Sequence, residues 1–244
     1  MKFQNKVVLI TGSASGIGFS AAQYFAKEGA SVILVDISAK LEAAERDLRS
    51  RGHNKVLVVR CDVSKEGEVI AAVDKAIATF GRLDVIVNNA GLMTFKRIID
   101  QVTDDWLRIL SVDLLGAFYF TKQALLKMEH GGSVINISSI HAIETTALVA
   151  PYAAAKTALL SLTRSAGLEG KERGIRFNAI LPGAIDTPML RDNPNIVTGV
   201  EKIDPADTGK PEDVVGAIAF LASAESNFVQ GAMIRVDGGR LDRL

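Results

Sequence analysis

Short apolar runs rich in β-branched residues recur along the chain, separated by longer amphipathic stretches. Within each run the apolar residues follow one another almost without interruption, which is typical of parallel strands buried on both faces. Strict alternation of such runs with helices, joined by right-handed crossovers, predicts a three-layer α/β fold around a doubly wound, seven-stranded parallel sheet. The expected strands are residues 6–10, 31–35, 55–59, 84–87, 133–137, 175–180 and 232–236, and the expected helices are 16–28, 39–51, 65–80, 103–128, 151–173 and 211–222.

One long stretch, from Pro182 to Lys210, breaks this alternation. It contains or borders five of the six prolines and has no clear hydrophobic period. The chain beyond it is too short to form a domain, so the stretch is not a linker. We therefore expect a single domain over residues 1–244, in which about residues 184–208 form either a substrate flap or a short helical insertion.

Composition and charge narrow the function classes. The 28 basic residues balance the 28 acidic ones, which removes the broad electrostatic case for binding nucleic acid or an anionic membrane. We find no uncharged apolar stretch of about eighteen residues and no signal-peptide core, so we expect a cytoplasmic protein without a membrane segment. Cys61 is the single cysteine, and no two histidines have metal-ligand spacing, so we expect neither a disulfide nor a metal site.

A glycine-rich sequence, TGSASGIG at residues 11–18, joins the first expected strand to the first expected helix. Glycines there let the backbone turn sharply and approach a pyrophosphate, whose charge the amides at the start of the helix would meet. A tight strand-to-helix turn without a ligand is the alternative. The surrounding strand and helix favour the phosphate role, so the candidate cofactor-binding residues here are Gly12, Ser15, Gly16, Ile17 and Gly18.

Asp36 ends the second expected strand, where dinucleotide-binding folds place an acid against the adenosine ribose. A carboxylate accepts a hydrogen bond from the ribose 2′-hydroxyl and repels a 2′-phosphate. Neither residues 13–15 nor Ile37 include a lysine or arginine that would offset this repulsion. We therefore expect NAD rather than NADP, with Asp36 and Ile37 at the ribose. The same position is also compatible with Asp36 as the N-cap of the following helix.

Two further strand ends border the same crevice, because ligands of such sheets lie beyond the carboxyl ends of the strands. Asp62 and Val63 follow the third expected strand, and residues 89–91, Asn-Ala-Gly, follow the fourth. Cys61, beside them, is expected to be a small buried hydrophobic residue and not a reactive one.

A tyrosine and a lysine supply the candidate acid/base chemistry. Tyr152 and Lys156 lie four residues apart on one expected helix, so both side chains leave the same face. Ser139, at the carboxyl end of the fifth expected strand, would point into the crevice. A phenol with its free pKa of about 10 is a poor base at neutral pH, and a nearby ammonium stabilises the phenolate. A tyrosine packed beside a solvated lysine would explain the pair equally well without the glycine loop.

In combination, these motifs resemble the short-chain dehydrogenase/reductase family over essentially the whole chain. The resemblance implies a Rossmann-like domain and reversible hydride transfer between a nicotinamide ring and an alcohol or carbonyl. It implies that Tyr152 is the general acid/base, that Ser139 holds the substrate oxygen, and that Lys156 binds the nicotinamide ribose and lowers the pKa of Tyr152. The matching residues are 11–18, Asp36, Asp62, Val63, 88–91, Ser139, Tyr152, Lys156, Asn178, Pro182, Gly183, Thr187 and 237–239.

The resemblance also assigns roles in the cofactor site. Asn89 and Val63 would frame the adenosine half, with Ala90 and Gly91 beside them. Ile185 and Thr187, after Pro182-Gly183, would secure the carboxamide and the phosphate.

Asp113 is a departure from the family pattern, because the family usually has an asparagine there. That asparagine belongs to a proton relay in which its backbone carbonyl holds a water beside the lysine, and an aspartate could keep the backbone contact. Its carboxylate favours a protonated Lys156 and opposes an anionic Tyr152. We therefore place Asp113 among the catalytic candidates and expect it to shift the pH profile without abolishing turnover.

The sequence indicates the substrate less closely than it indicates the reaction. His141 and Glu144 favour a sugar or polyol, and the sequence Ser-Ser-x-His is similar to sugar dehydrogenases of the family, although loop solvation explains both residues about as well. A 3-oxoacyl-[acyl-carrier-protein] reductase usually takes NADPH, so Asp36 argues against it. A hydroxysteroid dehydrogenase is a further candidate, and a non-catalytic NAD-binding sensor or scaffold is a candidate from a different class.

Two expected helices, 103–128 and 151–173, keep apolar residues on more than one face. Burial against a second copy of the chain is one outlet for this surplus. The resemblance implies a homotetramer or homodimer formed through these helices and the last strand, and a tightly packed monomer is the alternative.

Overall fold

The computed structural model describes residues 1–129, 131–199 and 203–241. Its seven strands form one parallel sheet, as expected, and their order in the sheet is β3-β2-β1-β4-β5-β6-β7. Each expected strand is present, and the largest difference is at the end of β6, which reaches Pro182 rather than Ile180. The strands are β1 (Val7–Thr11), β2 (Ser31–Asp36), β3 (Val56–Arg60), β4 (Val85–Asn88), β5 (Ser133–Ile137), β6 (Arg176–Pro182) and β7 (Met233–Val236).

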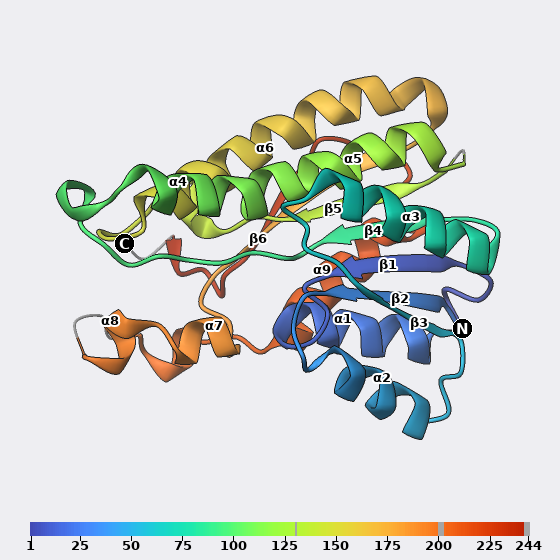
Figure 1. Ribbon diagram of the computed structural model, residues 1–244, viewed down its shortest axis with the longest axis horizontal. Helices are drawn as coiled ribbons and strands as arrows, with labels where there is room; N and C mark the ends of the chain where they lie inside the picture. Colours follow the sequence, from blue (N-terminus) through green and yellow to red (C-terminus); the bar gives the residue numbers. More distant parts are fainter. Residues whose placement is uncertain (130, 200–202, 242–244) are drawn as a thin grey trace.

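Helices cover both faces of the sheet, which explains why the strands are apolar throughout (Figure 1). In β1, Val8 and Ile10 pack into the core on one face, whereas Val7 and Leu9 pack into the core on the other. The first face is covered by α1 (Gly16–Lys27), α2 (Leu41–Ser50) and α9 (Pro211–Ala222), and the second by α3 (Glu66–Phe80), α4 (Thr103–Leu110), α5 (Gly116–Lys127) and α6 (Ala150–Gly170).

The order of the strands reverses between β1 and β4, so the loops that leave their carboxyl ends turn to opposite faces. A crevice opens at such a point in parallel sheets and is where their ligands bind. The ends of β2, β5 and β6 lie at the same edge, because all the strands are parallel.

The expected helix over residues 103–128 is present as one continuous helical segment, Thr103–Lys127, but it is not regular throughout. The segment consists of α4, a π-helical turn at Ser111–Leu115, and α5, which ends at Lys127. A π-helical turn inserts an extra residue and re-aims the side chains within it. Asp113 lies in this turn and is 1% exposed, so the irregularity directs a carboxylate into the interior.

Among the described residues, this same stretch, Thr103–Lys127, is long and apolar enough to cross a membrane by length and composition. The indication is weak, because 44% of the apolar window is buried inside the molecule, as in an ordinary core helix.

Within the described part of residues 182–210, the chain forms short helical pieces, which favours the helical-insertion alternative. These are α7 (Pro188–Arg191), α8 (Pro194–Val197) and a 3₁₀ turn at Pro205–Asp207. A bridge between Ile185 and Gly209 ties the two ends of the segment together. Its role as a substrate flap stays a prediction, and residues 200–202 lie outside the described residues.

Candidate active site

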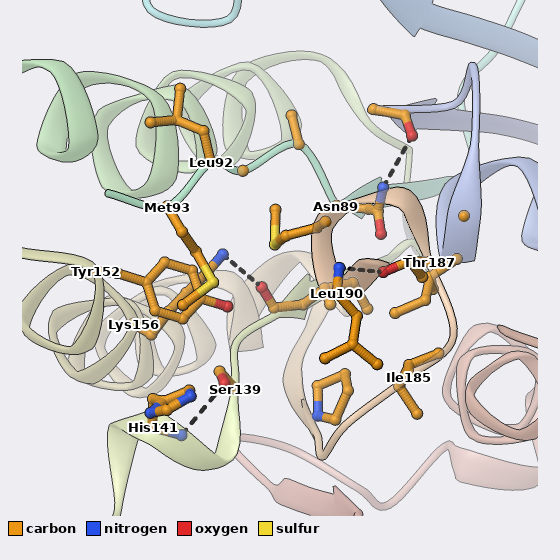
Figure 2. A pocket seen from close by; sticks show the side chains of 18 of the residues that line it. Asn89, Leu92, Met93, Ser139, His141, Tyr152, Lys156, Ile185, Thr187 and Leu190 are labelled. Carbon is orange, nitrogen blue, oxygen red and sulfur yellow. Dashed lines mark hydrogen bonds between the residues drawn. The ribbon is translucent and has the colours of Figure 1, made fainter. Parts of the chain in front are cut away.

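A cavity of about 900 Å³ lies at the carboxyl ends of the strands, between the glycine loop and α6 (Figure 2). Two expected site residues, Gly18 and Asp113, do not line it, because each is packed one layer behind its wall. The expected residues that line it are Gly12, Ser15, Gly16, Ile17, Asp36, Ile37, Asp62, Val63, Asn89, Ala90, Gly91, Ser139, Tyr152, Lys156, Pro182, Gly183, Ile185 and Thr187.

The glycine loop takes a conformation and a packing that side chains would prevent. Gly12 and Gly16 have φ angles of +62° and +56°, in the left-handed region. A Cβ on Gly18 would lie 2.3 Å from the carbonyl oxygen of Gly12 and 2.5 Å from Nδ2 of Asn89. Ser15, the N-cap of α1, makes no side-chain capping bond, so the loop presents the start of the helix to the cavity. This geometry fits a pyrophosphate.

Asn89 and Thr11 join the loop to the neighbouring strand. The amide Nδ2 of Asn89 donates to the carbonyl oxygens of Thr11 and Gly12, at 2.9 and 3.0 Å. In return, Oγ1 of Thr11 accepts from the backbone N–H groups of Asn89 and Ala90, both at 2.9 Å. Asn89 therefore holds the glycine loop in place as well as lining the adenosine side of the cavity.

The carboxylate of Asp36 is held at the end of β2 by two backbone amides. One oxygen accepts from the N–H of Ala14 at 2.9 Å and the other from the N–H of Ser38 at 2.8 Å. The alternative role as an N-cap is wrong, because α2 begins at Leu41 and Lys40 occupies its N-cap position. The two amides fix the carboxylate where it can accept a hydrogen bond from a ribose.

Arg60 is a cation near Asp36 that the sequence analysis missed. It pairs with Asp36 across β2 and β3, so its side chain starts beside the cofactor site. However, its guanidinium donates to Oε1 of Glu42 at 2.9 Å and to the carbonyl oxygen of Ile37 at 3.1 Å. These bonds pair the positive charge of Arg60 with the carboxylate of Glu42.

Asp62 and Cys61 complete the adenosine side. Oδ1 of Asp62 accepts from the backbone N–H and the hydroxyl of Ser64, at 3.0 and 2.6 Å. Burial raises the pKa of the Cys61 thiol to about 12, and nearby Glu68 and Asp62 contribute to the rise. Cys61 is thus an unreactive wall residue, as expected.

Tyr152, Lys156 and Ser139 meet at the other end of the cavity, although 13 residues or more separate Ser139 from the other two. All three are at least nine-tenths buried. Nζ of Lys156 lies 5.5 Å from the centre of the Tyr152 ring and donates to the carbonyl oxygen of Ile137 at 3.0 Å. Oγ of Ser139 accepts from the backbone N–H of His141 at 3.2 Å, which leaves its hydroxyl hydrogen for another acceptor.

Lys156 also faces a carboxylate directly. Oδ2 of Asp113 lies 3.3 Å from Nζ of Lys156, and Oδ1 of Asp113 accepts from the backbone N–H of Leu92 at 2.9 Å. The sequence analysis expected this carboxylate to favour a protonated Lys156, and the structure adds the distance between the two groups. Burial lowers the pKa of Lys156, but Asp113 and Tyr152 together outweigh burial and hold that pKa above its usual value.

The substrate side of the cavity is mixed in character. Its apolar walls include Met93, Val149 and Leu190, and its polar groups include His141 and Glu144. The ring of His141 stands edge-on to the Tyr152 ring at 5.9 Å and its Nδ1 lies 3.0 Å from Oγ1 of Thr145. A compact substrate with one apolar side and a second polar group fits this wall.

The sequence analysis missed several other wall residues, including Arg108, Arg240 and Leu241. Arg240 and Leu241, near the carboxyl terminus, line the cavity. No local motif marks them, because the fold alone brings that segment back to the site. Arg108, on α4, also lines it, and no local motif marks it.

Comparisons with known proteins agree with this geometry. The family model described as Enoyl-(Acyl carrier protein) reductase matches residues 12–240. The chain is 40% identical to cis-4-hydroxycyclohexanecarboxylate dehydrogenase of Sinomonas cyclohexanicum and 39% identical to the short-chain dehydrogenase/reductase aba4 of Botryotinia fuckeliana, with 97% of both chains covered in each case. The crystal structure of levodione reductase superposes with a TM-score of 0.92 at 33% identity, over 99% of this chain and 100% of that one.

Proposed function

The chain belongs to the short-chain dehydrogenase/reductase family and is an oxidoreductase of CH–OH groups, and from this premise we propose that NAD, rather than NADP, is its cofactor. The observation that carries the proposal is the carboxylate of Asp36, held by two amides at the cavity edge. A 2′-phosphate there would face this negative charge, and the guanidinium of Arg60 is engaged with Glu42. The ribose 2′-hydroxyl would instead donate to Asp36.

In this proposal the bound nicotinamide ring supplies or accepts the hydride, and the chain handles the proton. The hydroxyl of Tyr152 gives a proton to the substrate oxygen during reduction and takes it back during oxidation. Ser139 donates its hydroxyl hydrogen to the same oxygen and so orients it. Lys156 binds the nicotinamide ribose and brings a positive charge to the phenol, 5.5 Å from the ring centre.

For the substrate we favour a compact secondary alcohol, or the matching ketone, with a second polar group, as in a sugar or polyol. His141 and Glu144 on the cavity wall support this class. A hydroxylated cyclohexane carboxylate, named for the relative from Sinomonas cyclohexanicum, has the same features. A 3-oxoacyl-[acyl-carrier-protein] reductase or hydroxysteroid dehydrogenase activity is less well supported, because Asp36 opposes NADPH and the wall carries polar groups.

We also propose a homotetramer or homodimer in the cytoplasm. Large apolar side chains are exposed on the outer faces of α4, α5 and α6: Leu107, Phe118, Leu126 and Leu168. Such faces are costly in a monomer and are the expected sites of self-association. Sedimentation at micromolar concentration would detect the assembly, and a species of about 26 kDa would exclude it.

A fluorescence screen for NADH formation and consumption tests the function, with a panel of sugars, polyols, hydroxy acids and steroids. We expect turnover of at least one panel member with NAD, and a loss of roughly 10²- to 10⁴-fold in kcat for Tyr152→Phe. Tyr119→Phe is the matched control, because Tyr119 packs in the core of the α5 side and does not line the cavity. Binding of NAD without turnover would favour the non-catalytic sensor or scaffold.

A further inference from the structure

A buried ion pair lies behind the proposed proton donor. The carboxylate of Asp113 and the ammonium of Lys156 are 3.3 Å apart, and their side chains are 0% and 4% exposed. Among the described residues, Oδ2 of Asp113 accepts no hydrogen bond, so the ammonium is its one partner. A Cβ on Gly91 would lie 2.9 Å from this oxygen, so the pair fits only beside a glycine.

The two members of the pair act on Tyr152 in opposite directions. Burial disfavours the phenolate most, Lys156 favours it, and Asp113 disfavours it. The other groups that face the phenol are the hydroxyl of Ser139, which favours the phenolate through a hydrogen bond, and the ring of His141. Their balance holds the pKa of Tyr152 above its usual value.

Both charges of the pair are expected to be present at neutral pH. Burial raises the pKa of Asp113 above its usual value, and Lys156 and the N–H of Leu92 offset this only in part. A neutral Asp113 would leave the ammonium of Lys156 buried without a counterion, which costs several kcal/mol. A charge beside an opposite charge exerts a much weaker field than a charge alone.

We propose that Asp113 is a positioning residue that offsets the charge of Lys156 and thereby keeps Tyr152 protonated through neutral and mildly alkaline pH. The inference rests on the proposed function. Carbonyl reduction consumes one hydride from NADH and one proton from the Tyr152 hydroxyl, which then regains a proton from water. The site is therefore ready for reduction over a wide pH range, whereas alcohol oxidation, which needs the phenolate, is confined to alkaline pH.

Asp113→Asn removes the negative charge with almost no change of shape. We expect the pH profile of kcat/KM for alcohol oxidation to move to lower pH by about one unit, with the Kd of NADH unchanged. Asp104→Asn is the matched control, because Asp104 is an exposed acid on α4 and the same charge is lost outside the cavity. Coincident profiles would overturn the proposal. A shift to higher pH would also overturn it, because Asp113 would then act mainly by keeping Lys156 charged.

A titration without substrate separates this inference from the proposed function. The ultraviolet phenolate absorbance of the wild type, minus that of Tyr152→Phe, reports Tyr152 alone, whether or not any substrate is turned over. We expect Tyr152 of the wild type to ionise at a higher pH than a free phenol, and Tyr152 of Asp113→Asn to ionise at a lower pH than in the wild type. Phenolate near neutral pH in the wild type would overturn the inference even if Asp113→Asn did not fold.

Discussion

Replacing Asp36 by asparagine tests the cofactor preference most directly. The substitution removes the negative charge at the end of β2 but keeps one oxygen that can still accept from the N–H of Ala14 or Ser38. Alanine would leave both amides without this partner and would mix a loss of loop structure with the loss of charge. Asp36→Asn therefore isolates the electrostatic contribution.

The magnitude follows from two effects. A hydrogen bond from a ribose hydroxyl to a carboxylate contributes about 1.5–3 kcal/mol, so its weakening would raise the KM for NAD by about tenfold or more. A unit charge about 4 Å from a phosphate charge costs roughly 4 kcal/mol near a protein surface, and salt reduces this to about 2 kcal/mol. Relief of that repulsion would raise kcat/KM for NADP about 30-fold.

The assay is kcat/KM for NAD and for NADP at one substrate concentration and one ionic strength. We expect the preference for NAD to fall by at least about 100-fold in Asp36→Asn. Asp62→Asn is the control, because Asp62 lines the adenosine side but is occupied by Ser64. An unchanged ratio of the two cofactors in Asp36→Asn would refute the assignment of Asp36 to the ribose.

Two further predictions concern the loop and the stability of the fold. Gly18→Ala should weaken NAD binding by more than about tenfold, because its Cβ would lie 2.3 Å from a backbone oxygen. The control is Gly67→Ala on α3, where a Cβ meets nothing within 4 Å. This variant should bind NAD normally, and its free energy of unfolding in urea should rise by about 0.5–1 kcal/mol. Asp84→Asn should cost about 2 kcal/mol at pH 7, since burial raises the pKa of Asp84 but bonds from Arg82, Val7 and Lys6 outweigh it and lower that pKa. The stability that Asp84 contributes is present above the pKa of Asp84 in the unfolded chain and is lost as pH falls through its pKa in the folded chain. The difference in unfolding free energy between wild type and Asp84→Asn should therefore shrink below about pH 4. A difference that stays constant with pH would contradict this prediction.

The sequence by itself determined the architecture and predicted which residues form the candidate site. Continuous apolar runs such as those in β1 and β2 predicted a sheet buried on both faces, because the side chains of each strand pack against helices on both sides. The glycine loop, Asp36 and the Tyr152/Lys156 spacing are local patterns, and backbone geometry over a few residues decides what they can do. Local patterns are therefore enough to place them at one edge of the sheet.

The tertiary structure decided how closely the charges approach one another. Asp113 and Lys156 are 43 positions apart in the sequence. A π-helical turn, which the hydrophobic periodicity did not predict, brings Oδ2 of Asp113 to 3.3 Å from Nζ of Lys156. The engagement of Arg60 with Glu42 and the return of Arg240 to the cavity are likewise contacts between distant segments. Electrostatic interactions depend on distance and burial in three dimensions, and neither quantity is encoded in the spacing of residues along the chain.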